Sequence, residues 1–191
     1  MKLSDFIHFQ AGQMLTRLDE DISGKEYYLY SSEQFSVDLQ EKLQVDESEN
    51  KIIRTNKEVP VTREGMILIS SIYNQAVIVK KAHEGYLLSS NYIIITMNPN
   101  VLDPKFFCYW FNESKETRKQ ILLNQQGSSV SRLSIREIKN FEITMPKIEI
   151  QKSIGQVYVL QARKTLLEQR KAILSQQVLY QTLNQIQTEG V

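Results

Sequence analysis

Runs of apolar residues in the first two thirds of the chain have the length of β-strands. Residues 66–72 and 76–80 flank Tyr73-Asn74-Gln75, which predicts a β-hairpin around an asparagine-containing turn. Residues 86–89 and 92–97 are again β-branched and apolar, and they predict a second pair of strands. Between residues 38 and 64 the chain is polar and acidic, so we expect a long exposed connection or an irregular insertion there.

Helix signals follow from residue 103 onward. Asp103 is a good N-cap, and the proline after it fits the first helical position, where a missing N–H costs nothing. Ser134 and Glu137 have the spacing of a capping box, which predicts a short helix starting there. Residues 140–145 return to alternation and predict one more strand.

From residue 149 to about 187 there is no proline and no turn signal, so we predict one long helix. At about 1.5 Å per residue it would reach about 58 Å, which is longer than a globular domain needs for its own core. Two adjacent apolar ladders with a seven-residue repeat run along it, and the simplest cover for them is the same helix of a second copy. The alternative is a helix folded back on its own domain. The predicted interface residues are Val159, Leu166, Ile173 and Tyr180 in one ladder and Leu160, Leu167 and Leu174 in the other.

These patterns predict an α+β fold. Residues 1–146 would form a globular α/β domain with a twisted, mainly antiparallel sheet, and residues 147–191 a long C-terminal α-helix that pairs as a coiled coil.

Composition narrows the class of protein. The 191 residues carry a net charge of +1, but residues 1–95 hold 10 basic and 14 acidic side chains, against 13 and 8 in the remainder. The excess of positive charge in the second half fits either a solvated helical surface or a surface that faces phosphates. One cysteine excludes an internal disulfide, and no apolar run has the length of a membrane span, so we expect a cytosolic protein.

Motifs of catalysis are missing from the sequence. It has no Gly-x-Gly-x-x-Gly, no Gly-x-x-x-x-Gly-Lys-Ser/Thr and no Gly-x-Ser-x-Gly motif. His8 and His83 are far apart and belong to no cluster of metal ligands, so we expect structural roles for both and no metal site. The chain has the character of a binding protein that holds no cofactor of its own.

The segment from Asn124 to Gln151, NQQGSSVSRLSIREIKNFEITMPKIEIQ, followed directly by the long helix, resembles the DNA-specificity (S) subunits of type I restriction-modification systems. In that family a target-recognition domain ends in a Gly-Ser/Thr loop, a short helix, a strand that leads into prolines, and a long helix. The matching positions here are Gly127-Ser128, residues 133–139, residues 140–145, Pro146, Ile148 and Gln151.

Earlier segments agree with this resemblance. Residues 3–7 with Gly12 are similar to the opening of the family's domain, and residues 65–69 to its Gly-Asp-Ile-Leu motif. Ser90-Asn91 and residues 103–111 match its middle section. The sequence departs from the family at Met66, Lys147 and Ile150, where Asp, Pro and Glu are common. The specificity subunit of a related methylating nuclease is a close alternative.

The resemblance implies a subunit without catalytic activity that directs a partner to DNA. An adenine-methylating modification subunit would hold S-adenosylmethionine, and a translocating restriction subunit would join the complex. Full S subunits carry two recognition domains and two long helices, whereas this chain has one of each. Residues 1–146 would therefore be one target-recognition domain, and residues 147–191 the dimerisation and spacer helix of a half-subunit that pairs into a homodimer and reads a split target.

Amide and guanidinium side chains distinguish base edges in the major groove, and lysine and arginine hold phosphates. On this ground the candidate DNA contacts are polar loop residues in two segments, although each of them also fits an ordinary surface loop. They are Asn74, Gln75, Lys80 and Lys81 in the first segment, and Asn124, Gln125, Gln126, Ser128, Ser129 and Arg132 in the second.

Two other classes of function stay open. A coiled-coil adaptor whose globular head binds protein fits the near-neutral charge, and sequence-specific, salt-dependent binding to one duplex would distinguish it from an S subunit. An enzyme is the remaining alternative, and methyl transfer by the purified chain alone would reveal it.

Overall fold

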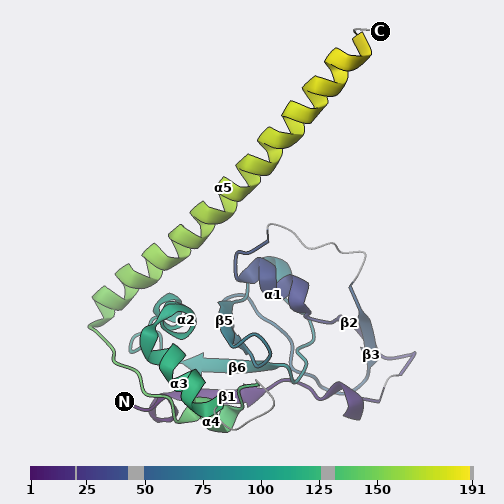
Figure 1. Ribbon diagram of the computed structural model, residues 1–191. Coiled ribbons are helices and arrows are strands. Elements are labelled where there is room, and N and C mark those ends of the chain that lie inside the picture. Colours follow the sequence, from purple (N-terminus) through teal and green to yellow (C-terminus); the bar gives the residue numbers. More distant parts are fainter. Residues whose placement is uncertain (20, 43–49, 126–131, 190–191) are drawn as a thin grey trace.

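Four antiparallel strands form the main sheet of the computed structural model, which describes residues 1–19, 21–42, 50–125 and 132–189 (Figure 1). The strand order is β1 (Ile7–Ala11), β6 (Tyr92–Met97), β4 (Ile67–Ser70) and β5 (Gln75–Ile78). The predicted hairpin is confirmed, because β4 pairs with β5 across the turn at residues 71–74. The mainly antiparallel sheet expected from the sequence is therefore present.

Two predicted strands were wrong. Residues 86–89 do not pair with β6; they make isolated bridges, for example between Leu87 and both Leu29 and Val61. Strand β6 is apolar on both faces and lies inside the sheet. It pairs with β1 on one side and with β4 on the other. Residues 140–145 keep the predicted alternation of buried and exposed side chains, but they contribute only one bridge, between Glu142 and Lys2.

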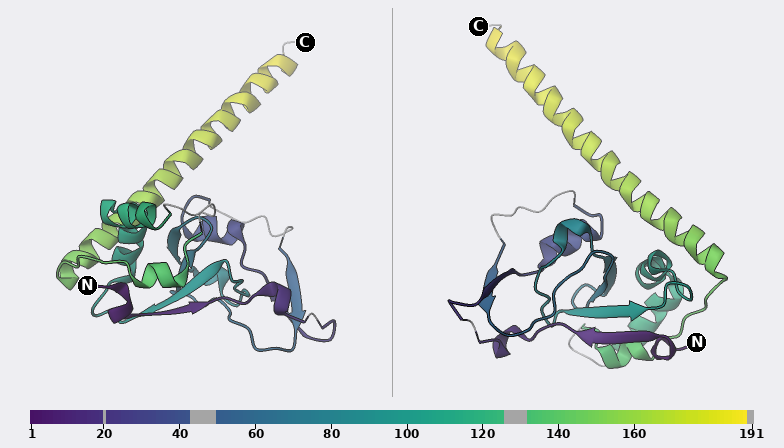
Figure 2. Two further views of the ribbon diagram at one scale, coloured as in Figure 1. Left: turned by 60° about the horizontal axis from the view of Figure 1, so that its bottom comes forward. Right: turned by 180° about the vertical axis from the view of Figure 1, so that it is seen from behind.

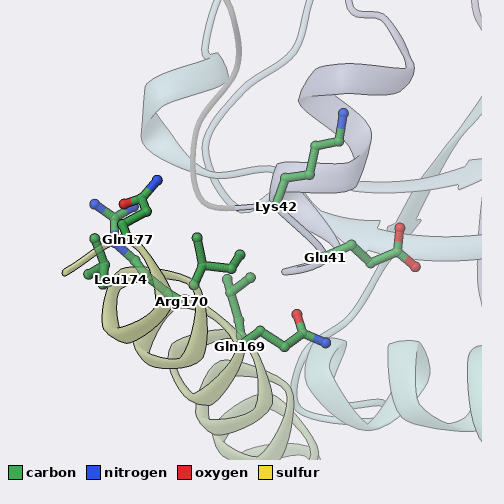
Figure 3. Close-up of a pocket in the computed structure, with 8 residues that line it drawn as sticks. Glu41, Lys42, Gln169, Arg170, Leu174 and Gln177 are labelled. Carbon is green, nitrogen blue, oxygen red and sulfur yellow. The ribbon is translucent and has the colours of Figure 1, made fainter. Parts of the chain in front are cut away.

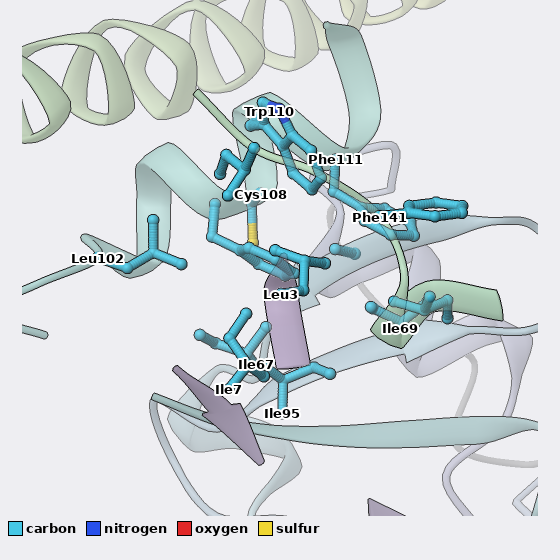
Figure 4. Close-up of a cluster of buried hydrophobic side chains, with 14 of the residues drawn as sticks. Leu3, Ile7, Ile67, Ile69, Ile95, Leu102, Cys108, Trp110, Phe111 and Phe141 are labelled. Carbon is cyan, nitrogen blue, oxygen red and sulfur yellow. The ribbon is translucent and has the colours of Figure 1, made fainter. Parts of the chain in front are cut away.

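Both faces of the sheet are covered. On one face Ile67, Ile69 and Ile95 join the larger core with the aromatic side chains of α2 (Pro104–Glu113), as Figure 4 shows. On the other face Leu68 packs in a second core with Phe35 of α1 (Ser32–Asp38). Because neighbouring strand residues point to opposite faces, the continuous apolar run of β4 serves both cores.

The polar stretch at residues 38–64 is not irregular throughout. Within it, β3 (Ile52–Thr55) pairs with β2 (Lys25–Tyr28) as a separate two-stranded ribbon. Burial alternates along β3, with Ile53 and Thr55 buried. The exposed position 52 carries an isoleucine and the buried position 55 a threonine, so the sequence itself shows little of the hydrophobic alternation by which strands are predicted.

Short-range capping starts two helices where they were predicted, whereas α1 and the helix at Lys115–Gln125 were not predicted. The Asp103 carboxylate accepts the backbone N–H groups of Lys105 and Phe106 at the start of α2. The capping box of Ser134 and Glu137 begins α4 (Ile135–Lys139). Between these helices lies α3 (Lys115–Gln125), which packs against α2.

A buried carboxylate ties α1 to the sheet. Asp38 accepts the hydroxyl of Tyr30 at 2.6 Å and the backbone N–H of Lys80 at 3.1 Å, and its Oδ1 lies 2.8 Å from Nδ1 of His83. Burial, with the neighbouring Asp38 charge, raises the pKa of Tyr30, so its hydroxyl stays protonated and donates to the carboxylate. The cluster fixes α1 above its face of the sheet.

The C-terminal helix α5 (Ile148–Glu189) has 42 residues and a length of about 63 Å. Figures 1 and 2 show that it packs on the head, residues 1–147, near its first turns and then extends away from it. The buried side chain of Gln151 joins the two parts: its Oε1 accepts the backbone N–H of Asp103 at 2.9 Å, and its Nε2 donates to the carbonyl oxygens of Val101 and Pro146. This joint holds the helix at a fixed place on α2.

Gly155 allows the close contact between α5 and α2. A Cβ atom at this position would lie 2.6 Å from Cβ of Lys105 and 2.6 Å from the backbone nitrogen of Phe106. We expect Gly155→Ala to lower the free energy of unfolding by about 1–3 kcal/mol through overpacking, although alanine is favoured over glycine inside helices. Urea unfolding would measure the change. Ser153→Ala, at an exposed position of the same helix, is the control; equal stability of the two variants would contradict this account of the joint.

Candidate nucleic-acid and helix interfaces

The first two predicted DNA contacts are Asn74, in the β4–β5 turn, and Gln75, at the start of β5. Asn74 has a left-handed backbone conformation, with φ at 54°, and its N–H donates to the carbonyl of Ser70 at 2.9 Å. Asparagine tolerates this conformation better than most residues. Gln75 is half-buried and lines a cavity together with Tyr158 and Gln161 of α5. The hairpin end therefore lies beside the long helix.

Lys80 and Lys81, the next two candidates, have different surroundings. The ammonium group of Lys80 donates to the carbonyl of Val37, and burial lowers its pKa. This geometry favours a structural role for Lys80 in holding α1, in place of a phosphate contact. Lys81 is exposed, and with Lys105 it lines a cavity of about 470 Å³ beside β5.

The second group of candidates flanks a segment outside the described residues. Asn124 is exposed near the end of α3, where its amide donates to the carbonyl of Gln120. Gln125 ends α3, and Arg132 is exposed just before the cap of α4. The remaining candidates, Gln126, Ser128 and Ser129, lie outside the described residues.

Among the described candidates, Arg132 does not lie with the first group. Asn74, Gln75, Lys80 and Lys81 belong to β5 and its flanks, at one edge of the main sheet. Arg132 precedes α4, which packs against β1 at the opposite edge. A single DNA surface made from the first group and Arg132 would have to span the whole sheet.

A polar cavity that the sequence analysis missed lies between the sheet and residues 58–66. Gln10 of β1, Thr96 of β6 and Arg63 line its volume of about 490 Å³, together with Glu58. Amide, hydroxyl and guanidinium groups are those that read base edges, so these residues are further candidates. The alternation in β1, where Ile7 and Phe9 are buried and Gln10 is exposed, could have indicated that Gln10 faces solvent. No pattern within a short stretch of sequence indicates that residues 10, 63 and 96 lie close together.

The two predicted ladders on α5 differ in their surroundings. Val159 and Leu166 are half-buried and line cavities shared with the head, so this part of the helix is partly covered by its own domain. The other predicted residues are 46–57% exposed: Leu160, Leu167, Ile173, Leu174 and Tyr180. Pairing through them stays a prediction.

A groove of about 460 Å³ separates α5 from the turn that follows α1 (Figure 3). Glu41 and Lys42 come from this turn, and Gln169, Arg170 and Leu174 face them from α5. The groove begins where α5 leaves the head.

No group of three or more His, Cys, Asp or Glu side chains in the described part of the chain is placed to hold a metal ion. Among those same residues, no helix is long and apolar enough to cross a bilayer.

Solved structures share this fold. The HsdS subunit of Thermoanaerobacter tengcongensis matches 90% of this chain with a TM-score of 0.55 at 14% sequence identity. A chain from the structure "Structural basis underlying complex assembly and conformational transition of the type I R-M system" matches 96% with a TM-score of 0.63 at 16% identity. This chain spans only 39% and 47% of those two proteins.

Comparison with curated proteins gave no match. The family model described as "Type I restriction modification DNA specificity domain" matches residues 1–173, which include the head and the first half of α5. The protein therefore belongs to the type I restriction-modification DNA specificity domain family.

Proposed function

We propose that this chain is a half-length S subunit that binds a specific double-stranded DNA sequence and directs an adenine methyltransferase to it. The observation that carries the proposal is the family match across the head and the first half of α5. The modification subunit would supply both S-adenosylmethionine and the methyl transfer, and a restriction or translocase subunit would join the same complex. In this proposal the chain itself contributes binding and no catalysis, and it acts in the cytosol.

Two copies would pair through α5 into a homodimer. With one head per chain and a two-fold antiparallel pair of helices, the two heads would read identical, inverted half-targets separated by a spacer of fixed length. A helix of about 63 Å allows one to two turns of DNA between the centres of the half-sites. In this proposal residues 1–146 are the target-recognition domain and residues 147–191 are the dimerisation and spacer helix.

Co-expression with the matching modification subunit tests the function. Sequencing of the host DNA should reveal a new split, inverted-repeat motif with methylated adenines. An asymmetric motif would indicate pairing with a different S chain. If the complex assembles and no methylation follows, the protein-binding adaptor would be the better account. Methyl transfer by the purified chain without a partner would overturn the non-catalytic role.

Arg63 offers a test of the polar cavity. If its guanidinium reads a base edge, Arg63→Ala should weaken binding to the specific duplex by about 1–3 kcal/mol and leave binding to unrelated duplexes nearly unchanged. Fluorescence anisotropy at fixed salt would measure both. The control is Arg54→Ala, since the exposed Arg54 already pairs with Glu26 at 2.6 Å. Equal losses on both duplexes would assign Arg63 to the phosphates.

A further inference from the structure

Strand β5 lies at one edge of the main sheet, and a single side chain of α2 closes part of its free edge. The backbone N–H of Ala76 donates to Oδ1 of Asn112 at 2.7 Å, and Nδ2 of Asn112 donates to the carbonyl oxygen of Ala76 at 2.9 Å. Asn112 thus gives Ala76 both hydrogen bonds that a neighbouring strand would give it. Ala76 is buried, so this pairing holds β5 to α2 at a defined position.

The same amide also reaches α5. Nδ2 of Asn112 donates to the hydroxyl oxygen of Tyr158 at 2.9 Å. An asparagine amide has two N–H donors and one carbonyl oxygen, and here all three groups make a hydrogen bond. The N–H of Ala76 can only donate, so it fixes which side of the amide carries the oxygen. One side chain therefore joins β5, α2 and α5, which are far apart in the sequence and pack together in the fold (Figure 1).

Asn112 lies where it can control the direction of α5. Gln151 holds the first turns of α5 near the start of α2, whereas Asn112, near the end of α2, contacts α5 about two turns further along. A rod held at one point can pivot, and a second point fixes its direction. At about 1.5 Å per residue, Tyr158 lies about 10 Å from Gln151, and Glu189 lies about 57 Å from it. A shift of about 1 Å at Tyr158 would therefore move the far end of α5 by about 5 Å.

The direction of α5 matters for the spacing of the half-sites. In the proposed dimer the two heads are connected through their helices, so the angle between each head and its own α5 determines how far apart the heads lie. One base pair adds about 3.4 Å to the distance between half-sites. A movement of about 5 Å at the end of α5 exceeds this step, so a loosely held helix would accept spacers of more than one length.

We propose that Asn112 is a positioning residue that fixes the angle between the head and α5, and with it the one spacer length that the protein accepts between its half-sites. The candidate base contacts Asn74 and Gln75 directly precede Ala76, so the strand that Asn112 anchors also carries them. A target with the wrong spacing is bound only when the head tilts and the hydrogen bond to Tyr158 breaks. This inference rests on the proposed function and adds the residue that makes the spacing strict.

Co-expression of Tyr158→Phe with the matching modification subunit tests the role in the full chain. The substitution removes one hydroxyl, keeps the ring against Tyr109, and leaves both hydrogen bonds between Asn112 and Ala76 in place. Sequencing of the host DNA should show the split motif still methylated at the wild-type spacing. Methylation of motifs one base pair shorter or longer should rise on the order of ten-fold, the factor that corresponds to one lost hydrogen bond. Asn112→Ala should relax the spacing in the same direction.

Thr117→Val is the matched control for lost stability. The buried hydroxyl of Thr117 donates to the carbonyl oxygen of Trp110 at 2.8 Å, within the junction of α2 and α3. This variant should lower methylation of the split motif without methylating motifs of another spacing. If Tyr158→Phe and Asn112→Ala behaved like this control, or left methylation unchanged, Asn112 would only stabilise the fold and the proposal would be overturned.

Spin labels provide a second measurement, which needs no DNA. Labels at Lys81→Cys on the head and Thr182→Cys on α5, both exposed positions, report the distance between the two parts in chains diluted with unlabelled protein. The native Cys108 is buried, and burial raises the pKa of its thiol, so it stays unlabelled. Tyr158→Phe should broaden the distribution of distances, and an unchanged width would contradict the role of Asn112. If the wild-type chain methylates no split motif, the proposed function and the spacing role both fail, whereas the width still shows whether Asn112 fixes the angle.

Discussion

Leu167→Glu combined with Leu174→Glu should convert the protein from dimers to monomers. Both leucines are about half exposed on α5, one heptad apart, at 50% and 46%. Full burial of each leucine in a helix pair is worth about 1.5–3 kcal/mol, and a buried carboxylate without a partner adds a further penalty. Light scattering at micromolar concentration would measure the mass. Neither side chain belongs to any of the three hydrophobic clusters of the head, so its circular dichroism should not change.

The matched control is Ser175→Glu combined with Thr182→Glu. It adds the same charge at the same spacing, at exposed polar positions that lie about a quarter turn or more from the leucine ladder. This variant should stay dimeric and support methylation of the split target, whereas the leucine variant should lose it. An intact dimer after the leucine substitutions would contradict pairing through this ladder.

Asp38→Ala should destabilise the head by about 3–5 kcal/mol, because it removes the shared acceptor of a buried polar cluster. The Asp38 side chain is fully buried, at 0% exposure, and it accepts from Tyr30 and from the backbone N–H of Lys80 while contacting His83. The hydroxyl of Tyr30 would be left in an apolar core. Urea unfolding followed by intrinsic fluorescence would measure the loss, with the destabilised variant showing a lower midpoint.

Glu33→Ala, on the same helix α1, is the appropriate comparison. Its carboxylate pairs with Lys42 at 2.6 Å, but both side chains are substantially exposed to solvent. Such surface pairs contribute about 0–1 kcal/mol, so we expect little change in stability. If the two variants lost equal stability, the buried cluster would not be what holds α1 to the sheet.

Local signals predicted α2, α4 and α5, whereas α1 and α3 were not predicted from the sequence. Asp103 and Ser134 satisfy backbone donors within a few residues of themselves, so the sequence alone contains all that their caps require. The β4–β5 hairpin was predicted for the same reason, since its two strands are separated by one short turn. The partners of β6 were not, because β1 lies more than 80 residues earlier in the chain and its pairing depends on the whole core.

The candidate DNA contacts show the same division. Sequence reasoning selected polar residues in loops, but it could not show that Lys80 donates to the carbonyl of Val37. It also could not join Gln10, Arg63 and Thr96, which meet only because β1 pairs with β6 and the chain at residues 58–66 crosses that face. Contacts between residues distant in the sequence depend on strand register and on packing of the hydrophobic core. Local composition determines neither of these.

The long helix was determined by the sequence itself: 42 residues without proline, with apolar ladders and no charged side chain at residues 172–188. Backbone hydrogen bonds within a helix are local, so its existence and length are readable directly. Only the tertiary structure decided which side of that helix faces the head, through Gln151 and Gly155 at the joint with α2. Because α5 packs against α2, the head covers one part of the apolar surface of α5 and leaves the other part exposed.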